Sequence, residues 1–260
     1  MVYKNISLNV SGALAEITLN RPKSLNALSG GLLVEMMHAL GIVQNSKKLK
    51  LLKLSGNGRA FCAGADLLFF ESIITDPKEL ANYIDTLNQV FFNIENLDIP
   101  TVSVVHGFAL AGGLELMLST DITLSSSSTR FGDQHINFGL IPGGGSTRRL
   151  EERIGKQSAI ELMISGRWMD ATEAEAKGLI YKTFADEVFN DEVDTFINNI
   201  LDKSYGSLTR IKNIMNHSKH NSREDAIRFE NNMFSNYVST HNDPQEGLKA
   251  FKEKRAPNFS

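Results

Sequence analysis

The chain has a single cysteine, Cys62, among its 260 residues. One cysteine excludes a disulfide within the chain and a zinc site built from several thiolates. No apolar run approaches the roughly 20 residues that a membrane-spanning helix needs. The N-terminal segment also lacks the basic and then apolar pattern of a signal peptide. We therefore expect a cytoplasmic protein with no membrane segment and no metal site.

Charge of one sign is also in short supply. The 27 Lys and Arg residues oppose 30 Asp and Glu residues, so the formal net charge is -3 at pH 7. Without a global cationic field, we expect no general attraction to nucleic acid or to an anionic membrane. With 42% hydrophobic and 22% charged residues, the chain can bury one substantial core and a small appended lobe.

Short strand-like and helical segments alternate over the first two-thirds of the chain, which is typical of an α/β protein. Alternating apolar residues from Ala13 to Leu19 predict a strand. Apolar residues at helical spacing from Leu32 to Val43, with Ser29 as a candidate N-cap, predict a helix. Further strands are expected at residues 50–55, 101–105 and 122–125.

Helical signals dominate beyond about residue 155. Thr172 with Glu175 has the spacing of a capping box and predicts a helix start. An apolar stripe follows one face of a later helix: Ala226, Phe229, Met233, Phe234 and Tyr237. We therefore divide the chain into an α/β core, residues 1–195, and a C-terminal helical lobe, residues 196–260.

Two loops rich in small residues are the main candidates for chemistry: residues 60–67 (AFCAGADL) and residues 107–115 (GFALAGGLE). Each follows an expected strand and precedes an expected helix, where free backbone N–H groups and the helix dipole favour negative charge. This arrangement suits an oxyanion. The alternative reading is that the glycines only make tight turns.

Taken together with two further segments, these loops resemble the signatures of the crotonase (enoyl-CoA hydratase/isomerase) family. The segments, in chain order, are Asn20-Arg21-Pro22 with Asn26-Ala27-Leu28, then residues 60–67, 107–116 (GFALAGGLEL) and 139–150 (GLIPGGGSTRRL). Residues 246–255 (EGLKAFKEKR) are similar to the family's C-terminal motif. The resemblance covers nearly the whole chain.

The resemblance implies an α/β fold, a spiral of strand-strand-helix units with a C-terminal helical region. In the family, that region joins subunits and covers the active site, so a homotrimer or hexamer is expected. The N–H groups of Ala65 and Gly112 would hold the thioester oxygen of an acyl-CoA as an enolate. Coenzyme A arrives with the substrate, so no separate cofactor is expected.

The resemblance also implies a path for the substrate and its coenzyme A. The residues at matching positions are Lys23, Leu25, Ala27, Ala63, Asp66, Leu67, Phe234 and Lys254. The last two match positions near the adenine and phosphate end, often on a neighbouring subunit.

Glu115 lies three residues after Gly112, so one helical turn carries its carboxylate to the side of the oxyanion donors. It matches the first catalytic glutamate of the family. At the position of the second glutamate this chain has His135, whose imidazole can transfer protons near neutral pH. One alternative is that His135 has only a structural role. Another is that Asp133 or Gln134 acts in its place, if the match to the family motif is shifted by one or two residues.

These residues predict hydration of a 2-enoyl-CoA, which needs one group for water and one for the α-proton. The alternatives are an isomerase or a decarboxylase that uses a single acid/base, on coenzyme A or on an acyl-carrier protein. A non-catalytic binding protein with this fold is a further alternative. A Cys62 nucleophile with His106 is less favoured, and we expect Arg148 and Arg149 to form salt bridges.

Overall fold

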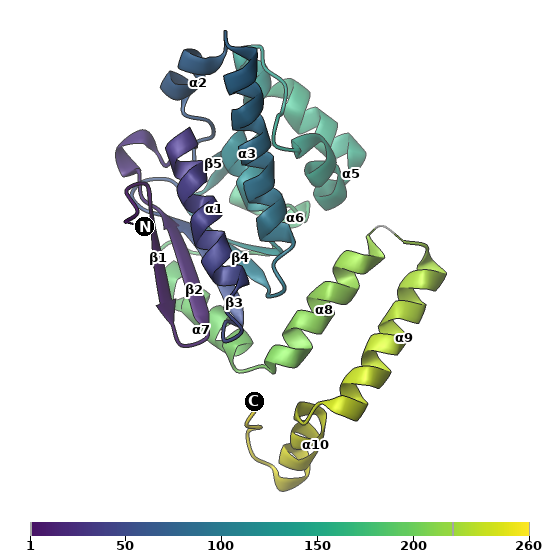
Figure 1. Ribbon diagram of the computed structural model, residues 1–260. Helices are drawn as coiled ribbons and strands as arrows, with labels where there is room; N and C mark the ends of the chain where they lie inside the picture. Colours follow the sequence, from purple (N-terminus) through teal and green to yellow (C-terminus); the bar gives the residue numbers. More distant parts are fainter. Residues whose placement is uncertain (1, 220, 260) are drawn as a thin grey trace.

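The structure is a computed structural model that describes residues 2–219 and 221–259. Its larger sheet has the strand order β1-β2-β3-β4-β6-β9 (Figure 1). The bounds are Ile6–Ser11 (β1), Leu14–Leu19 (β2), Leu51–Gly56 (β3), Thr101–Val105 (β4), Ile122–Ser126 (β6) and Lys182–Phe184 (β9). β1 pairs with β2 in antiparallel fashion and all other neighbours are parallel. Every residue of β4 is buried, as expected for a parallel strand covered on both faces.

A smaller sheet contains β5 (Phe108–Leu110), β7 (Arg130–Gly132) and β8 (Met169–Asp170). The chain twice passes from the larger sheet to the smaller one and then into a helix. The first unit is β4-β5-α4 and the second is β6-β7-α5, where α4 is Gly112–Leu118 and α5 is Ser146–Ser165. The expected α/β fold of strand-strand-helix units is confirmed.

Helices cover both faces of the larger sheet. α1 (Gly30–Gln44) and α3 (Pro77–Glu95) bury their apolar stripes on one face, and Ser29 caps α1 as predicted. α7 (Phe189–Leu201) packs on the other face, against apolar side chains of β3, β4 and β6. The boundary expected at residue 195 falls inside α7, so the helices that leave the core begin after Leu201.

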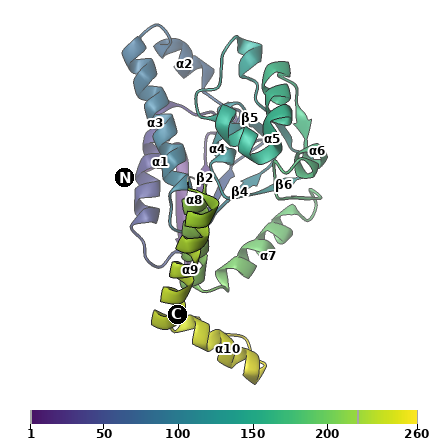
Figure 2. The same cartoon turned by 90° about the vertical axis from the view of Figure 1, so that its right-hand side faces the viewer.

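The last three helices extend away from the core (Figures 1 and 2). They are α8 (Tyr205–Ser218), α9 (Arg223–Thr240) and α10 (Asp243–Glu253). Lys212 ties α8 to the core, since its Nζ donates to the Ile99 carbonyl at 3.0 Å and lies 2.8 Å from Asp121 Oδ2. No described residue of α9 is fully buried. In its apolar stripe Phe234 is exposed, whereas the other members are half-buried: Ala226, Phe229, Met233 and Tyr237.

The capping box expected at Thr172 was wrong. α6 is Ala171–Ala176, and its N-cap is Asp170, whose carboxylate accepts a hydrogen bond from the Glu173 N–H at 2.8 Å. Glu175 instead accepts from the Thr183 N–H at 2.7 Å. An Asp two residues upstream is an equally good cap, and the end of β8 places it at the start of α6.

Among the described residues, no helix has both the length and the apolar character needed to cross a membrane. α2 (Leu67–Ile73) completes the helices of the core.

Candidate active site

The two glycine-bearing loops lie side by side. The Cys62 N–H donates to the Phe108 carbonyl at 3.0 Å, and the Leu110 N–H donates to the Cys62 carbonyl at 3.1 Å. Gly113 permits this approach, because a Cβ there would lie 2.1 Å from the Cys62 carbonyl oxygen. Backbone hydrogen bonds therefore join the two loops. Glycines that only made tight turns would not need this contact.

The N–H groups of Ala65 and Gly112 lie where the two loops contact each other. Leu28 bonds to the residues on either side of Ala65, so the N–H of Ala65 points away from Leu28. A Cβ built on Gly112 would lie 3.6 Å from the Ala65 nitrogen, and a Cβ built on Gly64 would lie 3.5 Å from the Gly112 nitrogen. The two N–H groups are thus neighbours.

Both N–H groups are available to a ligand. Gly112 is the first residue of α4, where an N–H has no partner within the helix. Within the described residues neither N–H donates to a protein acceptor. Ala111, just before Gly112, has φ 48° and ψ -121°, a strained conformation of the kind that functional sites retain. Two neighbouring N–H groups without protein acceptors can together bind one oxygen atom that carries negative charge.

Glu115 lies on α4 one turn after Gly112 and is only 1% exposed. Its Oε1 accepts from the N–H groups of Gly144 at 2.8 Å and Ser146 at 3.1 Å. Burial raises the pKa of the Glu115 carboxyl above its ordinary value, against the opposing effects of His135 and these N–H groups. A carboxyl shifted in this direction exchanges protons closer to neutral pH.

Arg149 on α5 supports the turn that holds Glu115. Its Nε and Nη2 donate to the two carboxylate oxygens of Glu95 at 2.6 and 2.9 Å, and its Nη1 donates to the Gly144 carbonyl. Arg148 pairs with Glu152 at 2.7 Å. The expected salt bridges of both arginines are confirmed.

His135 stands next to Glu115. Its Nε2 lies 3.9 Å from Glu115 Oε2, and its Nδ1 lies 2.8 Å from Asp133 Oδ1. The longer distance exceeds a direct hydrogen bond, and a small polar group beside the two atoms can bond to both. Burial lowers the pKa of His135, but the hydrogen bond to Asp133 and the charge of Glu115 outweigh it, so the pKa is raised.

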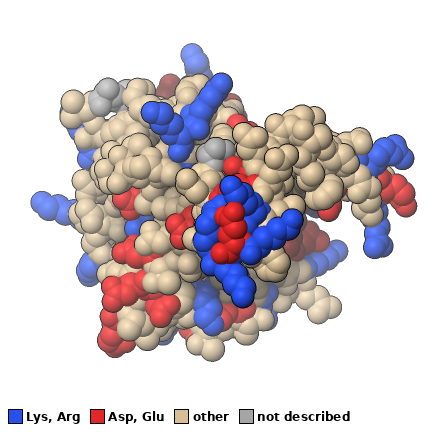
Figure 3. Space-filling view, turned by 90° about the horizontal axis from the view of Figure 1, so that it is seen from below, with Lys and Arg blue, Asp and Glu red and all other residues tan. Residues whose placement is uncertain are grey.

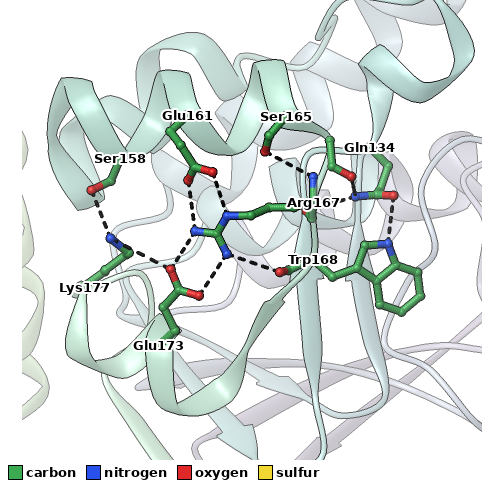
Figure 4. Close-up of polar contacts among 9 residues, drawn as sticks. Gln134, Ser158, Glu161, Ser165, Arg167, Trp168, Glu173 and Lys177 are labelled. Carbon is green, nitrogen blue, oxygen red and sulfur yellow. Dashed lines mark hydrogen bonds and ion pairs between the residues drawn. The ribbon is translucent and has the colours of Figure 1, made fainter.

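The side chain of Gln134 has a structural role. Its Nε2 donates to the carbonyls of Gly166 and Arg167 at 2.9 and 3.2 Å, and its Oε1 accepts from Trp168 Nε1 at 2.9 Å (Figure 4). Arg167 is itself held by two carboxylates of α5 and α6. Gln134 therefore anchors the segment that carries His135 and does not face Glu115.

Most residues of the expected substrate path gather around the first loop. The Ala63 N–H donates to the Leu25 carbonyl at 3.0 Å, which joins the two segments. Asp66 is occupied, since it pairs with Arg21 at 2.7 Å and caps α2. The six positions in this region are Lys23, Leu25, Ala27, Ala63, Asp66 and Leu67.

Phe234 and Lys254 lie elsewhere. Phe234 is on α9 and is 67% exposed, and Lys254 follows the end of α10 (Figure 1). Both helices extend away from the core, so a single chain does not bring these residues to Glu115.

A cysteine nucleophile is not formed. Cys62 is fully buried, and burial raises the pKa of its thiol to about 12. Its Sγ donates to the Asn26 carbonyl at 3.2 Å, while His106 Nε2 pairs with the Gly58 carbonyl at 2.9 Å.

Three contacts to the candidate acid/base groups did not follow from the sequence: those of Asp133, Gly144 and Ser146. An acidic residue two positions before a histidine was the available signal for Asp133. The Gly143-Gly144-Gly145 turn was the signal for the backbone donors to Glu115.

Gly144→Ala tests whether the turn places the Glu115 carboxylate. A Cβ at Gly144 would lie 2.6 Å from both Glu115 Oε2 and Phe91 Cε2, so the carboxylate must move. We expect kcat to fall by about 100-fold or more with the fold retained. Gly143→Ala is the matched control, because its Cβ meets Ile84 Cδ1 at 3.1 Å. Equal kinetics for the two variants would contradict this role of the turn.

Comparisons with known proteins show which family the chain resembles. The family model described as enoyl-CoA hydratase/isomerase matches residues 9–260. A probable mitochondrial enoyl-CoA hydratase of Dictyostelium discoideum is 38% identical over 248 residues, covering 95% of this chain and 88% of that protein. A crotonyl-CoA hydratase of Syntrophomonas wolfei is 33% identical over 260 residues, covering 100% of this chain and 99% of that protein. The crystal structure of an enoyl-CoA hydratase from Bacillus anthracis matches with a TM-score of 0.94 at 28% identity, over 98% of this chain and 99% of that one. The chain is therefore an enzyme of the enoyl-CoA hydratase/isomerase family, the crotonase family.

Proposed function

We propose that this enzyme adds water to the double bond of a 2-enoyl-CoA. The observation that carries the proposal is the second proton-transfer group, His135, whose Nε2 lies 3.9 Å from Glu115 Oε2. Hydration needs two such groups, one for the attacking water and one for the carbon next to the thioester. Glu115 lies one helical turn after Gly112 on α4.

The proposed oxyanion hole stabilises the charge that develops during the addition. When water attacks C3, electrons move from the double bond toward the thioester oxygen and form an enolate. The N–H groups of Ala65 and Gly112 donate to that oxygen. Loss of one such donor typically raises the barrier by about 3 kcal/mol.

Proton transfer balances within the Glu115 and His135 pair. One member accepts a proton from the attacking water, and the other gives a proton to C2. The pair ends with as many protons as it began with, and the product is a 3-hydroxyacyl-CoA. Coenzyme A is part of the substrate, so the reaction needs no added cofactor.

Double-bond isomerisation and decarboxylation are the competing reactions. Either needs only one acid/base beside the oxyanion hole, which Glu115 supplies. The position of His135 favours hydration, because a single-base reaction gives no reason to place an imidazole next to Glu115.

A panel of thioesters tests the proposal. Purified enzyme is incubated with 2-enoyl-CoA esters of several chain lengths, with 3-enoyl-CoA and with β-carboxyacyl-CoA, and products are identified by mass. We expect 2-enoyl-CoA to gain one water. Double-bond migration or loss of carbon dioxide without water addition would contradict hydration, and no turnover of any ester would favour a binding protein. Matching acyl-carrier-protein thioesters show which carrier is used.

The C-terminal helices are proposed to join subunits. α9 and α10 expose large apolar side chains, among them Phe234 at 67% and Phe251 at 82%. Viewed from below, where α10 lies nearest the viewer, basic side chains gather with acidic ones among them (Figure 3). Lys254 lies at this end and would serve the phosphates of coenzyme A bound to a neighbouring subunit.

We expect a homotrimer or a hexamer at micromolar concentration, because exposed apolar patches of this kind are normally covered by another chain. Light scattering gives the mass. Phe234→Arg should weaken the assembly, whereas Asn232→Arg, an exposed position on the same helix, should leave it intact. A stable wild-type monomer would rule the assembly out.

A further inference from the structure

Asp133 is a buried carboxylate whose burial the fold alone does not explain. It is 1% exposed, and its Oδ1 lies 2.8 Å from His135 Nδ1. Its Oδ2 is buried and has no hydrogen-bond partner among the described residues. Burying a charged group with an unused oxygen is costly, and a turn needs no such charge.

We propose that Asp133 is a positioning residue that holds His135 in one tautomer and aims its Nε2 at Glu115. The inference rests on the proposed function, in which His135 transfers a proton. Asp133 itself exchanges no proton with substrate.

The tautomer follows from what each atom can do. An ionised carboxylate only accepts hydrogen bonds, and neutral imidazole carries one N–H. The proton of neutral His135 therefore lies on Nδ1, which donates to Asp133 Oδ1 at 2.8 Å. Nε2 then presents a lone pair on the side of Glu115, 3.9 Å away. In the opposite tautomer, Nε2 would carry the proton and could not accept one from water.

The backbone holds this pair in register. The His135 N–H donates to the Asp133 carbonyl at 2.6 Å, so a tight turn joins the two residues. Between them, the side chain of Gln134 anchors the segment to the 166–168 connection (Figure 4). The imidazole is thus held from its Nδ1 side, while its Nε2 side remains free to act.

Asp133 also affects the charge of His135. The titratable groups that face His135 are Asp133 from its own segment and Glu115 from α4. Both favour the protonated imidazole and raise its pKa. Without the charge of Asp133, His135 would lose its proton at a lower pH, so the acid limb of the rate profile would move to lower pH.

A double-mutant cycle tests the inference. Asp133→Asn keeps the size and turn propensity of the residue but removes its charge and its preference for one tautomer. In the wild-type background we expect kcat to fall by about 100-fold or more, with KM within about threefold. The acid limb should move to lower pH. In the His135→Ala background, Asp133→Asn should have no further effect.

Asp170→Asn is the matched control, because an asparagine caps α6 as well as an aspartate does and the site is untouched. If the effects of Asp133→Asn and His135→Ala multiply, Asp133 acts independently of His135 and the inference is wrong. If His135→Ala alone leaves kcat unchanged, the two-group mechanism of the proposed function has failed instead.

A measurement on the wild-type enzyme tests the inference even if the Asp133 variant does not fold. Nitrogen-15 NMR of labelled histidine distinguishes a protonated Nδ1 from a protonated Nε2, and the His135 signals are assigned as those lost in His135→Ala. We expect the proton of neutral His135 on Nδ1. A proton on Nε2 would overturn the inference.

Discussion

Glu115→Gln should abolish turnover while leaving the site assembled. We expect kcat to fall by about 1,000-fold or more, because the amide cannot exchange protons. The amide oxygen can still accept from the N–H groups of Gly144 and Ser146, which now bond to Glu115 Oε1 at 2.8 and 3.1 Å. Acyl-CoA affinity should therefore stay within a few-fold. Near-normal turnover would remove Glu115 from the mechanism.

The same variant should not lose stability at pH 8. Burial raises the pKa of Glu115 in the folded state, so its contribution is present at low pH and is lost as pH rises through the folded pKa. Above that pH the ionised carboxylate destabilises the fold, and the neutral amide of the variant would remove this penalty. We expect an equal or higher thermal midpoint for the variant at pH 8, and a smaller difference at pH 4.

Glu35→Gln is the matched control, because its effect on stability should have the opposite sign. Glu35 is also buried, but it accepts from the N–H groups of Lys4, Asn5 and Ile6, and these bonds lower its pKa although burial alone would raise it. Its charge stabilises the fold at neutral pH and the effect is lost on acidification. Glu35→Gln should therefore lower the thermal midpoint and leave kcat unchanged. A lower thermal midpoint for Glu115→Gln at pH 8, together with a lower kcat for Glu35→Gln, would contradict the catalytic role of Glu115 and the structural role of Glu35.

His135→Ala should lower kcat by about 100-fold or more if His135 is the second proton-transfer group. The pKa of His135 is raised by Asp133 and Glu115 above that of free imidazole, about 6.5, so the wild-type acid limb should lie above that pH. The variant should lose this limb. His38→Ala, which removes an imidazole bonded to Tyr3 at the surface, is the control and should change neither rate nor profile.

His135→Glu extends the test. It restores two carboxylates and should recover hydration of crotonyl-CoA relative to His135→Ala. An unchanged rate and pH profile in His135→Ala would instead leave Glu115 as the one acid/base and favour the isomerase or decarboxylase reading.

Local patterns predicted much of this molecule. Ser29 and the apolar stripe behind it determine α1, because a cap and a 3.6-residue period act within one element. Glu115 was identified in the same way, since a spacing of three residues on a helix places it on the side of Gly112. Where two local signals compete, the sequence is less decisive, as the N-cap of α6 shows: Asp170, at the end of β8, takes the place expected for Thr172.

The sequence by itself therefore determined the fold class, the family and the identity of the two loops and of Glu115. Only the tertiary structure decided that the N–H groups of Ala65 and Gly112 are neighbours, that the Gly144 N–H donates to Glu115, and that Asp133 bonds to His135. It also placed Phe234 on α9, a helix that extends away from the core and from the Glu115 site of the same chain. The physical reason is that spacing rules fix geometry within one helix or strand, whereas distances between separate segments depend on strand register and packing.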